Sequence, residues 1–144
     1  MKIFLGGTSS KDWSMDWRPE FIKTLNDDLD YFNPIVKDWN EAAKQNEILQ
    51  RKVCDTLLYV ITPCMTGVYS IAEITEDCIT KTGKVVIVVL SDYKDKQFDE
   101  HQTSSIESCM SLWKKYTEHV YTDLSSVAQM LNERFEESKL LRNW

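Results

Sequence analysis

The sequence lacks any long hydrophobic run. Its longest apolar stretch, residues 85–90, is six residues long, whereas a membrane-spanning helix needs about 20. The chain also does not open with a basic segment followed by an apolar stretch, which is the pattern of a secretory leader. We therefore expect a soluble, cytoplasmic protein without a membrane partner.

Positive charge is scarce and scattered. The 144 residues include 17 Lys and Arg against 23 Asp and Glu, and no more than two basic residues stand together. Binding to the phosphate backbone of a nucleic acid requires a concentrated cationic face. The charge pattern argues against a nucleic-acid polymer as partner and leaves a small nucleotide open.

Metal-binding spacings are absent as well. The four cysteines contain no CxxC pair, and neither of the two histidines lies near them in the sequence. A zinc site needs a tight set of ligands, so we expect no metal, and we expect no other cofactor. The interpretation that remains is free thiols packed as small hydrophobic side chains.

Glycine and proline are few, with four and three residues, and no linker or repeat divides the chain. Short β-like runs alternate instead with helix-like stretches, which predicts a single α/β domain over residues 1–144. Crossover helices imply a parallel sheet covered on both faces. We expect a flavodoxin/Rossmann-like three-layer sandwich with a five-stranded parallel sheet in the flavodoxin order.

The predicted elements follow from the period of the apolar residues. The expected strands are residues 2–5 (ending at a turn at Gly6-Gly7), 31–34, 56–62, 85–90 and 118–121. Five helices are expected. The first begins at Pro19, with an apolar face that reaches Leu29, and the second extends from Asn40 to Val53. The third extends from Ser70 to Thr80 with Ile79 facing inward, the fourth carries Ile106 to Trp113 after a polar loop over residues 91–103, and the fifth is capped by Asp123.

Ligands of such sheets bind at the carboxyl ends of the strands. In this chain those ends lead into Gly6-Gly7-Thr8, Asn33-Pro34 and the loop 62–69. The loop leads to Ser70 and Glu73, which have the spacing of a capping box, a purely structural motif. The alternative is that Glu73 is a nucleophile or general base at the mouth of the sheet.

An ordered series of short segments surrounds this glutamate. The segments are Phe-Leu-Gly-Gly-Thr (4–8), Trp-Arg (17–18), Asn-Pro (33–34), Asp-Trp (38–39), Tyr-Val-Ile-Thr-Pro (59–63) and Gly-Val-Tyr-Ser-Ile-Ala-Glu (67–73). Together they resemble the nucleoside 2-deoxyribosyltransferase family, and most closely its small 2-deoxyribosyltransferase-like branch. The resemblance extends over residues 2–90.

The resemblance implies a retaining reaction at an N-glycosidic bond, in which Glu73 attacks the anomeric carbon of a nucleoside or nucleotide. It implies a second catalytic residue, Asp55, that helps to bind sugar or base. It also implies a homodimer or higher homo-oligomer, in which neighbouring subunits complete the site. The substrate-binding residues that it suggests are Gly6, Gly7, Thr8, Asn33, Asp38, Trp39, Thr66, Gly67, Tyr69 and Ser70.

Two departures from the family pattern bear on the reaction. Transferases of the family usually carry an aspartate six residues before the glutamate, where this chain has Gly67, although Thr66 could imitate the small polar residue of the nucleoside-monophosphate N-glycosidases. The usual glycine after the glutamate is replaced by Ile74. Three hypotheses therefore stay open: transfer or hydrolysis at an N-glycosidic bond, a non-catalytic nucleotide-binding or signal-sensing domain, and an NAD-type glycohydrolase.

Four residues are also weighed against simpler interpretations. Trp13 and Trp39 could stack on a nucleobase or merely bridge helix and sheet. Arg18 precedes a proline at a helix start, where a cation opposes the helix dipole. It could pair with a carboxylate or with a ligand phosphate, but we expect a solvated arginine on the surface. Glu76 could raise the pKa of Glu73 as a like charge one turn away.

Overall fold

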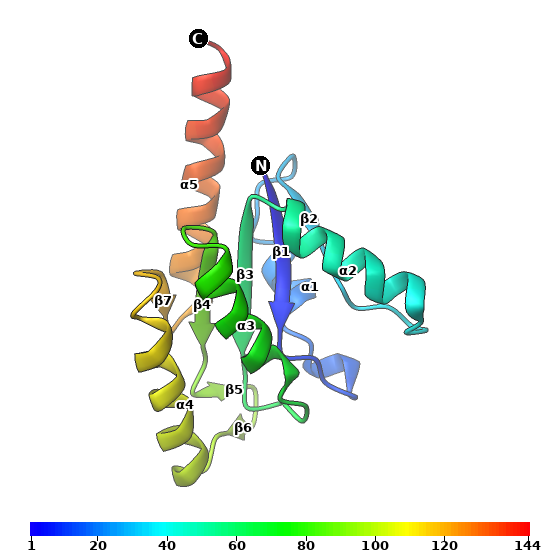
Figure 1. The fold of residues 1–144 in the computed structure, drawn as a ribbon, viewed down its shortest axis with the longest axis vertical. Helices are drawn as coiled ribbons and strands as arrows, with labels where there is room; N and C mark the ends of the chain where they lie inside the picture. The colour runs from blue at the N-terminus through cyan, green and yellow to red at the C-terminus, as the bar shows by residue number, and fades with distance from the viewer.

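A computed structural model describes all 144 residues, and it has an α/β fold built on one five-stranded sheet (Figure 1). The strands are β1 (Lys2–Gly7), β2 (Asp30–Phe32), β3 (Thr56–Ile61), β4 (Val85–Val89) and β7 (Val120–Tyr121). All pairings are parallel, in the order β2-β1-β3-β4-β7. The predicted Rossmann-like class and flavodoxin order are confirmed.

Five α-helices connect and follow the strands. They are α1 (Arg18–Ile22), α2 (Glu41–Val53), α3 (Tyr69–Thr80), α4 (Glu100–Trp113) and α5 (Leu124–Arg142), and a short 3-10 helix η1 (Trp13–Met15) follows β1. The predicted caps form, because Asn40 accepts from the amide of Ala43 at 2.9 Å and Asp123 accepts from that of Ser126 at 2.8 Å. None of the helices is long and apolar enough to cross a membrane.

The two faces of the sheet carry separate apolar layers. Side chains of β1, β3 and β4 alternate between them, as pleated strands that are buried on both sides must. One layer packs against α1 and α5, and the other packs against α3 and α4. Helix α5 continues past the edge of the sheet, so its last turns stand away from the rest of the molecule (Figure 1).

The first predicted helix is shorter than expected. Helix α1 ends at Ile22, and the chain continues in turns in which the amide of Leu25 donates to the carbonyl of Ile22 at 3.1 Å. The amide of Asn26 donates to the side-chain oxygen of Asn132 on α5 at 2.8 Å, so this amide is satisfied without an α-helical hydrogen bond. Leu25 and Leu29 are nevertheless buried, because the turns still face the sheet.

Two other expectations are corrected. The polar segment after β4 is not a plain loop, because it forms a small hairpin of β5 (Asp92–Tyr93) and β6 (Lys96–Gln97) before α4 begins at Glu100. Ile79 does not face inward and is 53% exposed. Helix α3 is rotated so that it buries two acids, Glu73 and Asp77, beside Ile74 and Cys78.

Candidate active site

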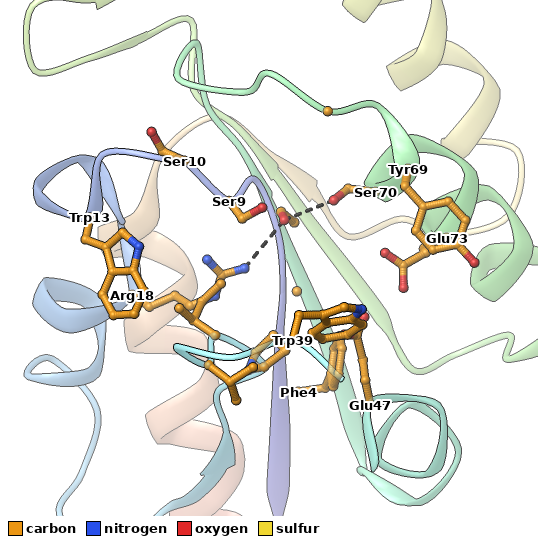
Figure 2. A pocket seen from close by; sticks show the side chains of 16 residues that line it. Phe4, Ser9, Ser10, Trp13, Arg18, Trp39, Glu47, Tyr69, Ser70 and Glu73 are labelled. Carbon is orange, nitrogen blue, oxygen red and sulfur yellow. Dashed lines mark hydrogen bonds between the residues drawn. The ribbon is translucent and has the colours of Figure 1, made fainter. Parts of the chain in front are cut away.

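A pocket of about 400 Å³ opens at the carboxyl ends of β1 and β3 (Figure 2). Its walls come from the end of β1, the segment that contains η1 and the start of α1, the chain between β2 and α2, helix α2 and the start of α3. The predicted residues that it brings together are Gly6, Gly7, Trp39, Gly67, Tyr69, Ser70 and Glu73.

Five predicted residues do not line this pocket. Asp55 lies at the amino end of β3, whereas the pocket lies at the carboxyl ends of the strands, and its carboxylate accepts from the amide of Lys2 at 2.7 Å. Thr8 is buried and its hydroxyl accepts from the amide of Thr62 at 2.9 Å. The other three lie on neighbouring loops without lining the cavity: Asn33, Asp38 and Thr66.

The capping box predicted from Ser70 and Glu73 does not form. The residue before the helix is Val68, and no side chain caps the first turn of α3. The hydroxyl of Ser70 donates instead to the carbonyl of Gly7 at 3.0 Å, which ties the start of α3 to the end of β1 (Figure 2). Glu73 is therefore free of a capping role, and its carboxyl group turns toward α2.

Gly6 and Gly7 are needed for packing as well as for the pocket. A Cβ atom on Gly6 would lie 2.6 Å from ring atoms of both Phe4 and Tyr59. Gly7 has a φ of +108°, and a Cβ atom there would lie 2.1 Å from the carbonyl oxygen of Val60. Strand β1 thus continues through both glycines, paired with β3, where the sequence predicted a turn.

The carboxyl groups of Glu73 and Glu47 meet in the pocket. Glu73 comes from α3 and Glu47 from α2, and both side chains line the pocket, where each carboxyl group affects the pKa of the other. Burial and the neighbouring Glu47 carboxylate raise the pKa of Glu73 to about 7, and burial also raises the pKa of Glu47. Of the two carboxyl groups, Glu73 therefore has the stronger tendency to hold a proton.

Sequence reasoning missed Glu47 and considered Glu76 in its place. The side chain of Glu76 is 66% exposed, whereas that of Glu73 is 10% exposed, so Glu76 is largely in solvent. Glu47 lies in the middle of the strongly polar helix α2, and nothing in the local sequence indicates which of the acids on this helix faces the pocket. Only the packing of α2 beside α3 identifies it.

Arg51 and Asp77 extend this acidic pair into a buried network. Arg51 donates to both carboxylate oxygens of Asp77, at 2.8 and 3.1 Å, and its third nitrogen lies 3.4 Å from Glu73. Asp77 is fully buried and also accepts from Tyr59 and Lys81. Hydrogen bonds from Arg51, Lys81 and Tyr59 outweigh the effect of burial and hold the pKa of Asp77 below its usual range.

Arg18 is buried, which corrects the expectation of a surface arginine. Only 1% of it is exposed, and its guanidinium donates to the carbonyls of Leu5 and Thr8 at 2.8 and 2.9 Å and to Asp16 at 2.9 Å. Burial lowers its pKa, although Asp16 opposes this. Arg18 fixes the turn after β1 and places a positive charge in the pocket wall.

Two exposed indole rings lie on the rim of the pocket. Trp13 is 55% exposed and Trp39 is 57% exposed, and both line the cavity. In Figure 2, Trp39 lies close to Phe4 and Glu47, whereas Trp13 lies beside Arg18. Exposed aromatic faces on a pocket offer stacking surfaces for a planar ring system. No group of three or more His, Cys, Asp or Glu side chains in the chain could hold a metal ion.

Comparison with protein families places this pocket in a known group. Residues 1–93 match the family described as nucleoside 2-deoxyribosyltransferase like, and this range contains every residue that lines the pocket. Searches of curated proteins and of solved structures each gave no match. The family indicates a nucleoside deoxyribosyltransferase-like function with a small nucleoside-type substrate. With 93 of its 144 residues matched, the chain belongs to the nucleoside 2-deoxyribosyltransferase-like family.

Proposed function

We propose that this protein breaks or exchanges the N-glycosidic bond of a (deoxy)nucleoside or its 5′-monophosphate, with Glu73 as nucleophile and Glu47 as proton donor. The observation that supports this proposal is the pair of neighbouring glutamates from α3 and α2 in the lining of one pocket. A retaining glycosyl transfer needs two such groups, one to attack and one to supply a proton.

In the first step the carboxylate of Glu73 attacks the anomeric carbon and forms a glycosyl ester. The electron pair of the C–N bond leaves with the base, through a transition state with oxocarbenium character. In the second step water or an acceptor base attacks the same carbon and releases Glu73 as a carboxylate. Water gives hydrolysis, and a base gives transfer with retention at the anomeric carbon.

The departing base needs a proton, and Glu47 is the group that supplies it in this proposal. The position where transferases carry an aspartate is Gly67, and Glu47 and Glu73 are the only acids that line the pocket. Glu47 gives its proton to the base as the bond breaks and takes one from water or the acceptor in the second step.

The charge of the pair stays constant through this cycle. The higher pKa of Glu73 favours the shared proton on Glu73 in the free protein, so the reacting state is the one in which this proton has moved to Glu47 and the single negative charge lies on Glu73. After attack Glu73 is a neutral ester, and the negative charge has passed to Glu47. The two buried carboxyls therefore never have to be ionised together, which their proximity would make unfavourable.

Other pocket residues are assigned to substrate binding in this proposal. Trp39 and Phe4 lie on the side of Glu47 and would stack on the base that receives its proton (Figure 2). Ser9, Ser10 and Arg18 lie across the pocket, where hydroxyl and guanidinium groups suit a 5′-hydroxyl or a 5′-phosphate.

The test is chromatography of free base after incubation with deoxynucleosides, ribonucleosides, their 5′-monophosphates and NAD. We expect release of base from at least one nucleoside or monophosphate, abolished in Glu73→Gln. The matched control is Glu41→Gln, an exposed glutamate on α2 outside the pocket. Adding a second free base to an active reaction distinguishes transfer from hydrolysis.

The same panel distinguishes the alternatives. Release of nicotinamide from NAD alone would favour the NAD-type glycohydrolase. Thermal stabilisation by a nucleotide without any release of base would favour a binding domain, and either result would contradict the proposed reaction.

A further inference from the structure

Behind Glu73 lies a buried group of charged side chains that has no direct part in the proposed reaction. It consists of Arg51 on α2 and Asp77 on α3, with Tyr59 and Lys81 bonded to Asp77. Buried charges are unfavourable unless they are paired, and even a paired network contributes little to stability, so a functional role is expected of this network.

The guanidinium of Arg51 is held in one orientation. Its Nε donates to Oδ2 of Asp77 at 3.1 Å and its Nη2 donates to Oδ1 at 2.8 Å, the two-point geometry that fixes an arginine plane. This leaves Nη1 directed to Glu73, with its oxygen Oε2 at 3.4 Å. Arg51 is only 8% exposed, so it cannot turn away without leaving a buried carboxylate unpaired.

Asp77 is in turn fixed to the centre of the fold. It accepts from the hydroxyl of Tyr59, on the central strand β3, and from Lys81, the residue that follows the end of α3, at 2.5 Å. Neither of these groups forms an ion pair or hydrogen bond with Glu73 or Glu47. The network therefore has one outward connection to the pocket, which is the contact of Arg51 with Glu73.

This contact distinguishes the two carboxyls of the pair. Arg51 forms ion pairs with Glu73, Glu76 and Asp77 but none with Glu47, although Glu47 lies one turn before it on α2. The charged and titratable groups that surround Glu73 come from every element packed around it: Glu47 and Arg51 from α2, Glu76 and Asp77 from α3, Lys81 just after α3, and Tyr59 from β3, with Arg18 from α1 beyond Glu47. Among them, Arg51 is the cation that contacts Glu73.

We propose that Arg51, clamped by Asp77, is a positioning residue that stabilises the carboxylate form of Glu73, the form that attacks, against the effects of burial and of the neighbouring Glu47. This inference rests on the roles that the proposed function gives to the two acids. Arg51 touches neither sugar nor base, and it acts by placing a fixed positive charge beside the attacking oxygen.

The first test measures the titration of Glu73 directly, so that it does not depend on turnover. Carbon-13 NMR of protein labelled at glutamate carboxyls, assigned with Glu73→Gln, would follow the Glu73 signal against pH in wild type and in Arg51→Gln. We expect the midpoint to move upward by about one pH unit or more when the cation is removed. The control is Lys52→Gln, an exposed cation next to Arg51 on the same helix, which should leave the midpoint unchanged.

The second test separates positioning from a purely structural role. Arg51→Gln should lower kcat at least tenfold at pH 6 with little change in KM. The loss should be equal for an ordinary purine deoxynucleoside and for its N7-methylated, cationic form, which leaves without a proton. Arg51→Lys keeps the charge but cannot contact Asp77 and Glu73 together. Its kcat should therefore lie between the kcat of the wild type and that of Arg51→Gln.

If Arg51→Gln does not fold, the NMR titration and the kinetic comparison are both made with Arg51→Lys. An unchanged Glu73 midpoint in a folded Arg51 variant would overturn the inference, whatever happens to activity. Wild-type protein that releases no base would contradict the proposed function instead, and the NMR titration would still decide the role of Arg51.

Discussion

Glu47 and Glu73 line one pocket and shift each other's pKa, although the two residues belong to different helices and are 26 positions apart. Arg51 lies one turn after Glu47 on α2 and Asp77 lies one turn after Glu73 on α3, and Arg51 forms ion pairs with both Asp77 and Glu73 across the two helices. The proposed nucleophile, its proton donor and its electrostatic support all come from this one contact between helices.

Substitution of Glu47 should affect catalysis according to the leaving group. In Glu47→Gln we expect kcat/KM to fall by about 100-fold or more for an ordinary purine deoxynucleoside, because the base then leaves without a proton. For the N7-methylated nucleoside the fall should be less than about tenfold, since that base departs neutral. Equal losses on both substrates would contradict a role as proton donor.

The pH profile should reflect the shared proton. Burial and the Glu47 carboxylate raise the pKa of Glu73 to about 7, so above that pH the pair is fully ionised and no proton remains for the base. We therefore expect kcat/KM to decrease above about pH 7 in wild type. The decrease should disappear when Glu47→Gln is assayed with the N7-methylated nucleoside, and its persistence there would point to another titrating group.

Glu73→Gln should stabilise the protein while it abolishes the reaction. The pKa of Glu73 is 4.5 in the unfolded reference and about 7 in the folded state, so ionisation favours unfolding as the pH rises between these values. A neutral glutamine avoids this, and we expect a gain on the order of 1–3 kcal/mol at pH 8. Denaturant unfolding of the variant and wild type at pH 8 and pH 4.5 measures it. A gain of the same size at both pH values would contradict the assignment.

Gly7→Ala should be strongly destabilising. The backbone there has a φ of +108°, and the added methyl would lie 2.1 Å from the carbonyl oxygen of Val60. We expect a loss of at least about 2 kcal/mol in the free energy of unfolding. Gly67→Ala is the matched control, because no atom lies within 4 Å of its added methyl, and it should change stability by less than about 0.5 kcal/mol.

The end of α5 should take part in self-association. Leu140 and Leu141, in the last turn of α5, are 64 and 76% exposed, and Trp144, just after the helix, is 102% exposed. This part of the chain extends beyond the sheet (Figure 1). Exposed apolar groups gathered in this way are typical of a contact surface. Sedimentation of the wild type should show a homodimer or larger assembly that Leu141→Glu shifts toward monomer. A monomeric wild type at high concentration would contradict the homo-oligomer prediction.

Much of the fold could be predicted from the sequence, because the period of the apolar residues is a local property. Runs such as Val85–Val89 can be buried on both faces only inside a parallel sheet, and the alternation with helices leaves few topologies. The direction of the chain then placed the site at the carboxyl ends of the strands. Asp55 precedes β3 in the chain, so it lies at the amino ends of the strands, away from the pocket. Only the resemblance to the family had suggested Asp55 as a site residue.

The acidic pair and its network were decided only by tertiary packing. On α2 the apolar Leu49 and Val53 are 52 and 56% exposed, whereas Arg51 is buried, so the hydrophobic pattern indicates the wrong face. The reason is energetic: burying Arg51 becomes favourable only because Asp77 and Glu73 approach from another helix and satisfy its charge. The sequence determined the sheet, its order and the position of Glu73, and the packing of α2 against α3 determined what surrounds it.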